Sequence, residues 1–138
     1  SKLRFFGIPG GYQLSVIVEN IKTISRGVSP LSMATRKGLR SINQPVHIQV
    51  FVTPTDTACP PVARLAHALA IENTNITADV IETEEFPALV QQYGIRSVPI
   101  TIINDLTQIS GLTSEQEFVD KVLQCGVRNE AGSVKVQA

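Results

Sequence analysis

Cys59 is the side chain best placed for chemistry, because it opens a predicted helix directly after a predicted strand. The turn residues 53–55 separate the two elements. A cysteine in the first turn of a helix has its thiolate favoured by the helix dipole and by free backbone N–H groups. Reactive groups also gather where a central strand of an α/β sheet ends against a helix N-terminus. The pattern therefore predicts a thiol site at Cys59.

Asp56 lies three residues before Cys59 and is expected to quieten that thiol. Asp56 and Thr57 are both good N-cap residues, so we expect the helix to start there, with an aspartate cap worth about 0.5–2 kcal/mol. The negative charge of Asp56 opposes formation of a thiolate one turn away. The alternative is that Asp56 accepts the Cys59 proton and supports monothiol chemistry, such as sulfenate formation or glutathionylation.

The composition argues against most other kinds of site. Twelve basic residues balance twelve acidic ones, and no basic stretch exceeds a pair, so neither nucleic acid nor an anionic membrane is an expected partner. No apolar run approaches the roughly 20 residues that span a bilayer. The two cysteines and two histidines lack zinc-ligand spacing, so we expect no metal and no cofactor. The chain is expected to be soluble and cytoplasmic.

Hydrophobic periodicity predicts alternating strands and helices. Strands are expected at 3–8, 46–53, 76–81, 100–103 and 107–110, and helices at 14–24, 29–42, 56–72, 84–93 and 114–125. The last two strands read as an antiparallel hairpin, and Ser114 with Glu117 forms a capping box for the last helix, which Gly126 caps at its other end. The strand 46–53 is apolar on both faces, which places it centrally in the sheet. This order predicts an α/β fold with a mixed sheet.

Several segments resemble the glutaredoxin-like protein disulfide oxidoreductases, which carry two tandem thioredoxin-fold units. Residues 50–55, 59–60, 64–67, 71–73 and 98–99 are similar to the second unit, and residues 4–9 and 25–27 to the last strand and helix of the first. The resemblance implies a thioredoxin/glutaredoxin-like three-layer α/β/α fold. It also implies a remnant of the first unit at 1–27, a linking helix in 28–44, a complete unit at 45–125 and a tail at 126–138.

The chain departs from the family signature T-P-T-C-x-x-C-P at one decisive position. Asp56 stands where the first cysteine, the nucleophile of the family, is expected, and Cys59 matches the resolving cysteine. Without a partner thiol in reach, Cys59 cannot cycle between dithiol and disulfide. Cys125 falls at the far end of the last predicted helix. We therefore expect a degenerate D-x-x-C site and a non-catalytic binding module, with a monothiol oxidoreductase or thiol sensor acting through Cys59 as the alternative.

Pro99 is the second functional candidate, since it resembles the cis-proline of the family. That loop presents backbone groups to an extended peptide, so binding can survive the loss of catalysis. Local sequence alone favours an ordinary trans proline that starts a strand. The substrate-binding residues implied by the resemblance are Thr55, Thr57, Ala58, Val98 and Pro99. The implied partner is a protein or peptide, with glutathione as a further candidate.

Three other features lead to expectations that a structure can check. The strand 3–8 lacks its family neighbours, which predicts either a homodimer through this edge or docking on the chain's own second unit. Glu82 is expected at a solvated strand end, with an approach to the motif as the alternative. His67 lies about 12 Å along the helix from Cys59, too far to act as its base, and is expected to be at the surface or half-buried.

Overall fold

The computed structural model describes residues 2–7 and 29–128 of the chain. Its elements are β1 (Lys2–Phe6), α2 (Met33–Leu39), β2 (Val46–Val52), α3 (Cys59–Glu72), β3 (Ile76–Glu82), a 3-10 turn (Thr83–Glu85), α4 (Pro87–Tyr93), β4 (Ile100–Ile103), β5 (Thr107–Ser110) and α5 (Glu115–Gly126). The five predicted strands are confirmed, each to within two residues at either end. The predicted helix 14–24 and the tail beyond residue 128 lie outside the described residues.

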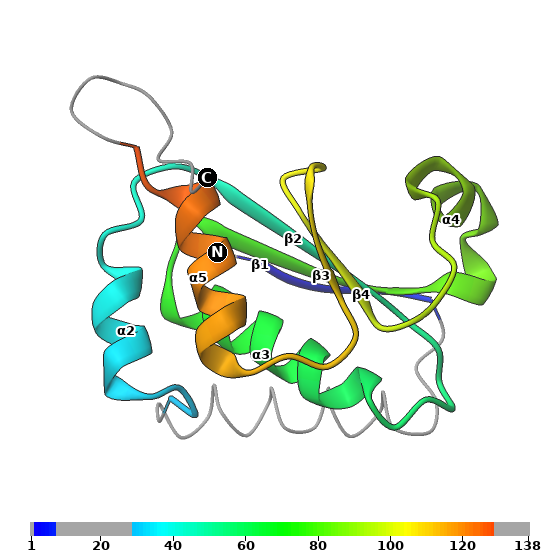
Figure 1. Cartoon of the computed structure of the whole chain (residues 1–138), viewed down its shortest axis with the longest axis horizontal. Coiled ribbons are helices and arrows are strands. Elements are labelled where there is room, and N and C mark those ends of the chain that lie inside the picture. The colour runs from blue at the N-terminus through cyan, green and yellow to red at the C-terminus, as the bar shows by residue number, and fades with distance from the viewer. Residues whose placement is uncertain (1, 8–28, 129–138) are drawn as a thin grey trace.

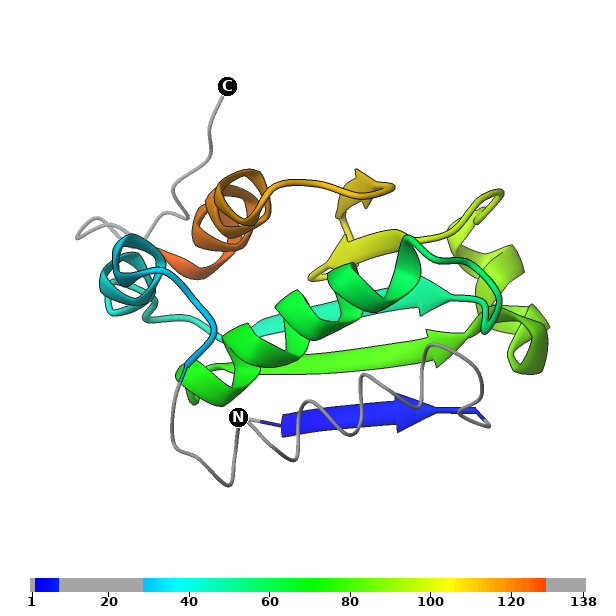
Figure 2. The same ribbon diagram turned by 90° about the horizontal axis from the view of Figure 1, so that it is seen from below.

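The strands form one mixed sheet in the order β1-β3-β2-β4-β5. The first three of these run parallel, while β4 is antiparallel to β2 and β5 antiparallel to β4, which confirms the predicted hairpin. Helices α2, α3 and α5 cover one face, and α4 packs on the other (Figures 1 and 2). The predicted three-layer α/β/α arrangement is therefore confirmed.

The central strand β2 contributes to the core on both faces of the sheet, as its apolar pattern predicts. Ile48 and Val50 belong to the large cluster beneath α2, α3 and α5. Phe51 belongs to the smaller cluster beneath α4, where it lies 5.8 Å from the Tyr93 ring, centre to centre. Burial on both faces holds the carboxyl end of β2 in place, and the loop that leads to Cys59 begins there.

Strand β1 docks on the chain's own sheet, which confirms one of the two arrangements expected for it. It pairs in parallel with β3, and Arg4 lies opposite Asp79. The Arg4 guanidinium donates to both carboxylate oxygens of Asp79, at 2.6 and 2.9 Å, and His47 Nε2 lies 2.6 Å from Asp79 Oδ2. This group ties β1, β3 and β2 together. The homodimer stays a prediction.

The ends of two helices differ in part from expectation. Ser114 caps α5 by accepting from the Glu117 N–H at 3.2 Å, as predicted. The Glu117 carboxylate accepts from Thr113 Oγ1 at 3.1 Å instead of from the Ser114 N–H, so only half of the predicted capping box forms. Gly126 is the last residue of α5 rather than a cap beyond it, and a Cβ there would lie 2.7 Å from Val46 Cγ2. Helix α2 starts at Met33, later than the expected residue 29, because Ser32 supplies its N-cap. No helix in the described segments is long and apolar enough to cross a membrane.

Candidate functional site

The loop between β2 and α3 carries the Asp56 to Cys59 motif, and Asp56 folds it. Asp56 Oδ1 accepts from the Ala58 N–H at 2.8 Å, and the Asp56 C=O accepts from the Cys59 N–H at 3.3 Å. The aspartate is therefore used inside a turn, as this short side chain often is, and the N-cap position falls to Ala58. The predicted N-cap at Asp56 or Thr57 is wrong by one or two residues.

Cys59 is the first residue of α3 and is completely buried, with 0% of its surface exposed. Burial raises the pKa of the Cys59 thiol to about 11, although a backbone hydrogen bond from Thr53 favours the thiolate, and the charges of Asp56 and Glu82 raise the pKa further. Asp56 thus acts in the predicted direction, but burial is the larger cause. Pro60 and Pro61 lie in the first turn of α3, where their missing N–H groups cost nothing.

Glu82 ends β3 on the same face as Val80 and is buried, which corrects the expectation of a solvated residue. Burial raises the pKa of the Glu82 carboxyl from 4.5 to about 7, and the nearby charges of Glu84 and Glu85 add to this. Its Oε1 atom has no hydrogen-bond partner within the described residues. The alternative, an approach to the motif, describes the structure better, because the Glu82 charge acts on Cys59. The period-two alternation from Ile76 to Glu82 already places Glu82 on the buried face of β3.

The Val98–Pro99 peptide bond is cis, as the family resemblance implied. The Val98 side chain packs against the core cluster that contains Cys59, so the Pro99 loop and the motif meet at one cluster. The Pro99 C=O accepts from the Gly111 N–H at 2.8 Å. Within residues 2–7 and 29–128, the Val98 N–H and C=O take no hydrogen bond. They are free to pair with an extended segment.

Gly111 and Leu112 are site residues that sequence reasoning missed. The Gly111 bond to Pro99 places both beside the cis-proline loop, and Leu112 is 63% exposed. The available signal was a leucine directly after the predicted hairpin, where no core element needs it. Of the predicted binding residues, Thr55 and Thr57 are exposed and Ala58 is half-buried, all on the loop before Cys59.

The remaining sulfur and imidazole groups lie away from this site. Cys125 is a free, half-buried thiol whose Sγ is 3.5 Å from Thr107 Oγ1 on β5. His67 is only 2% exposed, with Nε2 3.4 Å from the Arg4 C=O, so the expectation of a surface or half-buried histidine is wrong. Its burial results from the packing of α3 against β1. The described part of the chain holds no group of three potential metal ligands.

The thioredoxin domain family model matches residues 46–124, more than half of the chain. The chain belongs to the thioredoxin domain family. The structure is similar to that of a protein disulfide oxidoreductase from Aeropyrum pernix, with a TM-score of 0.85 and 32% identity over 97% of this chain and 58% of that chain. It is also similar to the NTD_N/C domain of the alkylhydroperoxide reductase AhpF from Enterococcus faecalis, with a TM-score of 0.80 and 25% identity over 86% of this chain and 56% of that chain.

Several curated relatives are much longer than this thioredoxin-family chain. An NADH dehydrogenase from Bacillus subtilis is 24% identical over 118 residues, which are 86% of this chain and 23% of that protein. The chain spans about a quarter of the length of such relatives. The resemblance to protein disulfide oxidoreductases is confirmed, and the chain is a thioredoxin-like domain of a redox family.

Proposed function

We propose that this thioredoxin-like domain binds an extended segment of another protein at the Pro99 loop and does not exchange disulfides itself. The observation that carries the proposal is the state of Cys59, the single thiol of the motif, which is fully buried with its pKa raised to about 11. A thiol that is neither exposed nor ionised near neutral pH is a poor nucleophile. With Asp56 at the position of the first cysteine, the motif also lacks the nucleophile whose mixed disulfide Cys59 would resolve.

Binding is supported by the free backbone and the exposed side chains at the Pro99 loop. The Val98 N–H and C=O can add a strand from a partner, while Leu112, Thr55 and Thr57 offer side-chain contacts on either side. Main-chain pairing of this kind gives affinity, and the flanking side chains give selectivity. None of these groups needs a thiol.

The alternative is a monothiol enzyme or sensor that uses Cys59. Its support is Glu82, a buried carboxyl with a pKa of about 7 whose charge acts on the thiol and which could accept the Cys59 proton. This alternative requires a thiol that reacts well below about pH 8. In the Cys125→Ser variant, Cys59 is the single remaining cysteine. A thiol titration of this variant excludes the monothiol alternative if the pKa of Cys59 is ordinary or raised.

An insulin-reduction assay with dithiothreitol tests the loss of catalysis. We expect no turnover by the wild-type domain and clear turnover by Asp56→Cys, because the new thiolate can attack the insulin disulfide and Cys59 can then release the reduced chain. Asp56→Ser is the matched control, since it removes the charge without adding a thiol. Turnover by the wild-type protein contradicts the proposal, and turnover by Asp56→Ser contradicts the view that the missing thiol is what abolishes catalysis.

Selection from a random dodecapeptide phage library on the immobilised domain tests binding. We expect wild-type protein to enrich peptides and Leu112→Asp to lose them, because Leu112 lies beside Pro99. Leu106→Asp is the matched control, since Leu106 is 88% exposed at the tip of the β4–β5 hairpin. Equal enrichment by the two variants contradicts a binding site at the Pro99 loop.

A further inference from the structure

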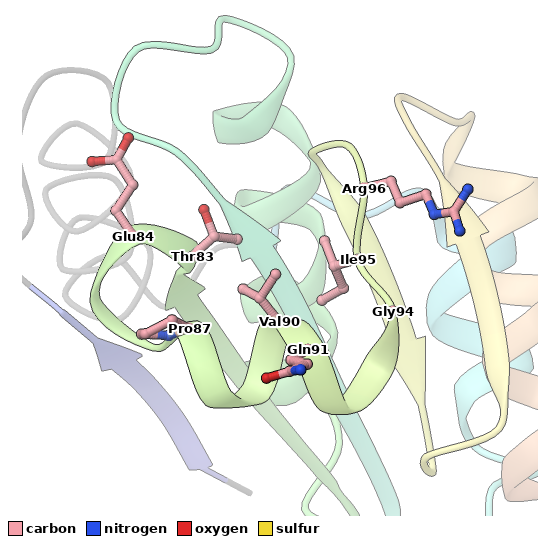
Figure 3. Close-up of a pocket in the computed structure, with 8 residues that line it drawn as sticks. All are labelled: Thr83, Glu84, Pro87, Val90, Gln91, Gly94, Ile95 and Arg96. Carbon is pink, nitrogen blue, oxygen red and sulfur yellow. The ribbon is translucent and has the colours of Figure 1, made fainter.

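A pocket of about 480 Å³ lies next to the Pro99 loop and is not used by backbone pairing at Val98. The 3-10 turn, helix α4 and residues 94–96 form its walls (Figure 3). The lining residues that carry the argument are Thr83, Glu84, Pro87, Val90, Ile95 and Arg96.

Two walls of this pocket lie close to the candidate site in the structure or along the chain. Thr83 Oγ1 donates to the Val52 C=O at 3.2 Å, which fixes one wall against the strand end where the motif loop begins. Arg96 forms part of the other wall and lies two residues before Val98 in the same loop. The pocket and the Val98 backbone therefore lie on neighbouring parts of one loop.

The pocket has an apolar lining between two opposite charges. Val90 and Ile95 are both half-buried at the pocket wall, and the Val90 C=O accepts from the Ile95 N–H at 2.9 Å, which holds the loop against α4. Glu84 and Arg96 lie at opposite sides of the pocket (Figure 3). Both are exposed, and neither has a hydrogen bond or ion pair within the described residues. Two charges are therefore available to a ligand.

We propose that this pocket selects the sequence of the bound segment: an apolar side chain over Val90 and Ile95, an acidic side chain at Arg96 and a basic side chain at Glu84. The inference rests on the proposed function and names the chemistry of its partner. Side chains two residues apart on an extended strand share a face, so alternate residues of the bound segment can face the pocket. An acidic side chain of the ligand is disfavoured at the Glu84 side of the pocket, because Glu85 follows Glu84 and adds a second negative charge there.

Charge variants in the same dodecapeptide selection test this inference. We expect wild-type protein to enrich peptides that carry one acidic and one basic residue in a fixed order around an apolar residue. Arg96→Glu and Glu84→Lys each lose one of the two charge preferences, and the double variant selects the reversed order. A peptide enriched by wild-type protein binds Arg96→Glu about fivefold more weakly, as expected for an exposed charge pair. Arg40→Glu, an exposed residue at the end of α2, is the matched control for net charge.

The outcomes separate this inference from the proposed function. If the charge variants select the same sequences as wild-type protein, or lose no more affinity than Arg40→Glu, the pocket proposal is overturned while peptide binding at Leu112 stands. If wild-type protein enriches no peptide beyond the Leu112→Asp background, both proposals fail. A selected order that reverses with the double variant supports both.

Discussion

The burial and the pKa of the Glu82 carboxyl are set by the residues packed around it. A Cβ on Gly7 would lie 2.6 Å from Glu82 Cβ, so only glycine allows the end of β1 to cover this carboxyl so closely. Gly7 also has a φ of 114°, a conformation that other residues rarely adopt. The result is a buried carboxyl next to Cys59 that holds its proton up to about pH 7.

Glu82 makes the stability of the domain depend on pH. Because its pKa rises from 4.5 to about 7 on folding, the folded state binds the proton more tightly, so the free energy of unfolding falls as pH rises through this window and levels off above it. Glu82→Gln removes this dependence, and we expect it to be more stable than wild-type protein above about pH 7. Urea midpoints measured across the window check this. Asp120→Asn, an exposed control on α5, keeps the wild-type slope, and an unchanged slope in Glu82→Gln contradicts the prediction.

Strand β1 is held to the sheet by a group whose members come from three strands. Asp79 is 3% exposed and carries the hydrogen bonds from Arg4 and His47. A nearly buried carboxylate that loses a partner is costly, whereas an exposed ion pair contributes little. Arg4 therefore contributes more to the attachment of β1 than its solvent exposure alone would suggest.

Arg4→Ala tests how β1 is attached. We expect a loss of about 1–3 kcal/mol in the free energy of unfolding, because Asp79 loses two charge-assisted hydrogen bonds. Faster amide exchange in β1 is expected to accompany it. Arg36→Ala is the matched control: its ion pair with Glu72, at 3.4 Å, is exposed, so we expect a change within about 0.5 kcal/mol. Equal losses in the two variants contradict the role of Arg4.

Elements whose signals are local could be predicted from the sequence, and contacts between distant elements could not. The alternation from Val46 to Val52 and the Ser114 side-chain cap are set by neighbouring residues, and both agree with the structure. The burial of His67 depends on a strand more than sixty residues earlier in the chain. The N-cap predicted at Asp56 is wrong for a local reason. An aspartate side chain can bond within a turn as readily as it caps a helix.

At the scale of the whole molecule, the two cysteines differ in burial and therefore in their access to a thiol reagent. Cys59 belongs to the large core cluster, whereas Cys125 packs at its margin and is half-buried. In native protein we expect a thiol reagent to label Cys125 alone, and in denatured protein both cysteines. In a Cys125→Ser background, labelling of Cys59 then requires unfolding of the core, so its rate follows the global stability.

Two glycines give opposite changes in that labelling rate. Gly126→Ala places a methyl group 2.7 Å from Val46 Cγ2 and 3.2 Å from Ile42 Cγ2, an overpacking that costs about 1–3 kcal/mol. Cys59 is then labelled about fivefold to 150-fold faster. Gly38→Ala is the matched control within α2, where the new Cβ meets Leu123 Cδ1 at an ordinary 3.5 Å, and the gain of about 0.5–1 kcal/mol slows labelling. If both variants label Cys59 at the wild-type rate, the thiol becomes accessible through a local opening at the start of α3. That result would reopen the monothiol alternative, because a reagent or substrate could then reach Cys59 in the folded domain.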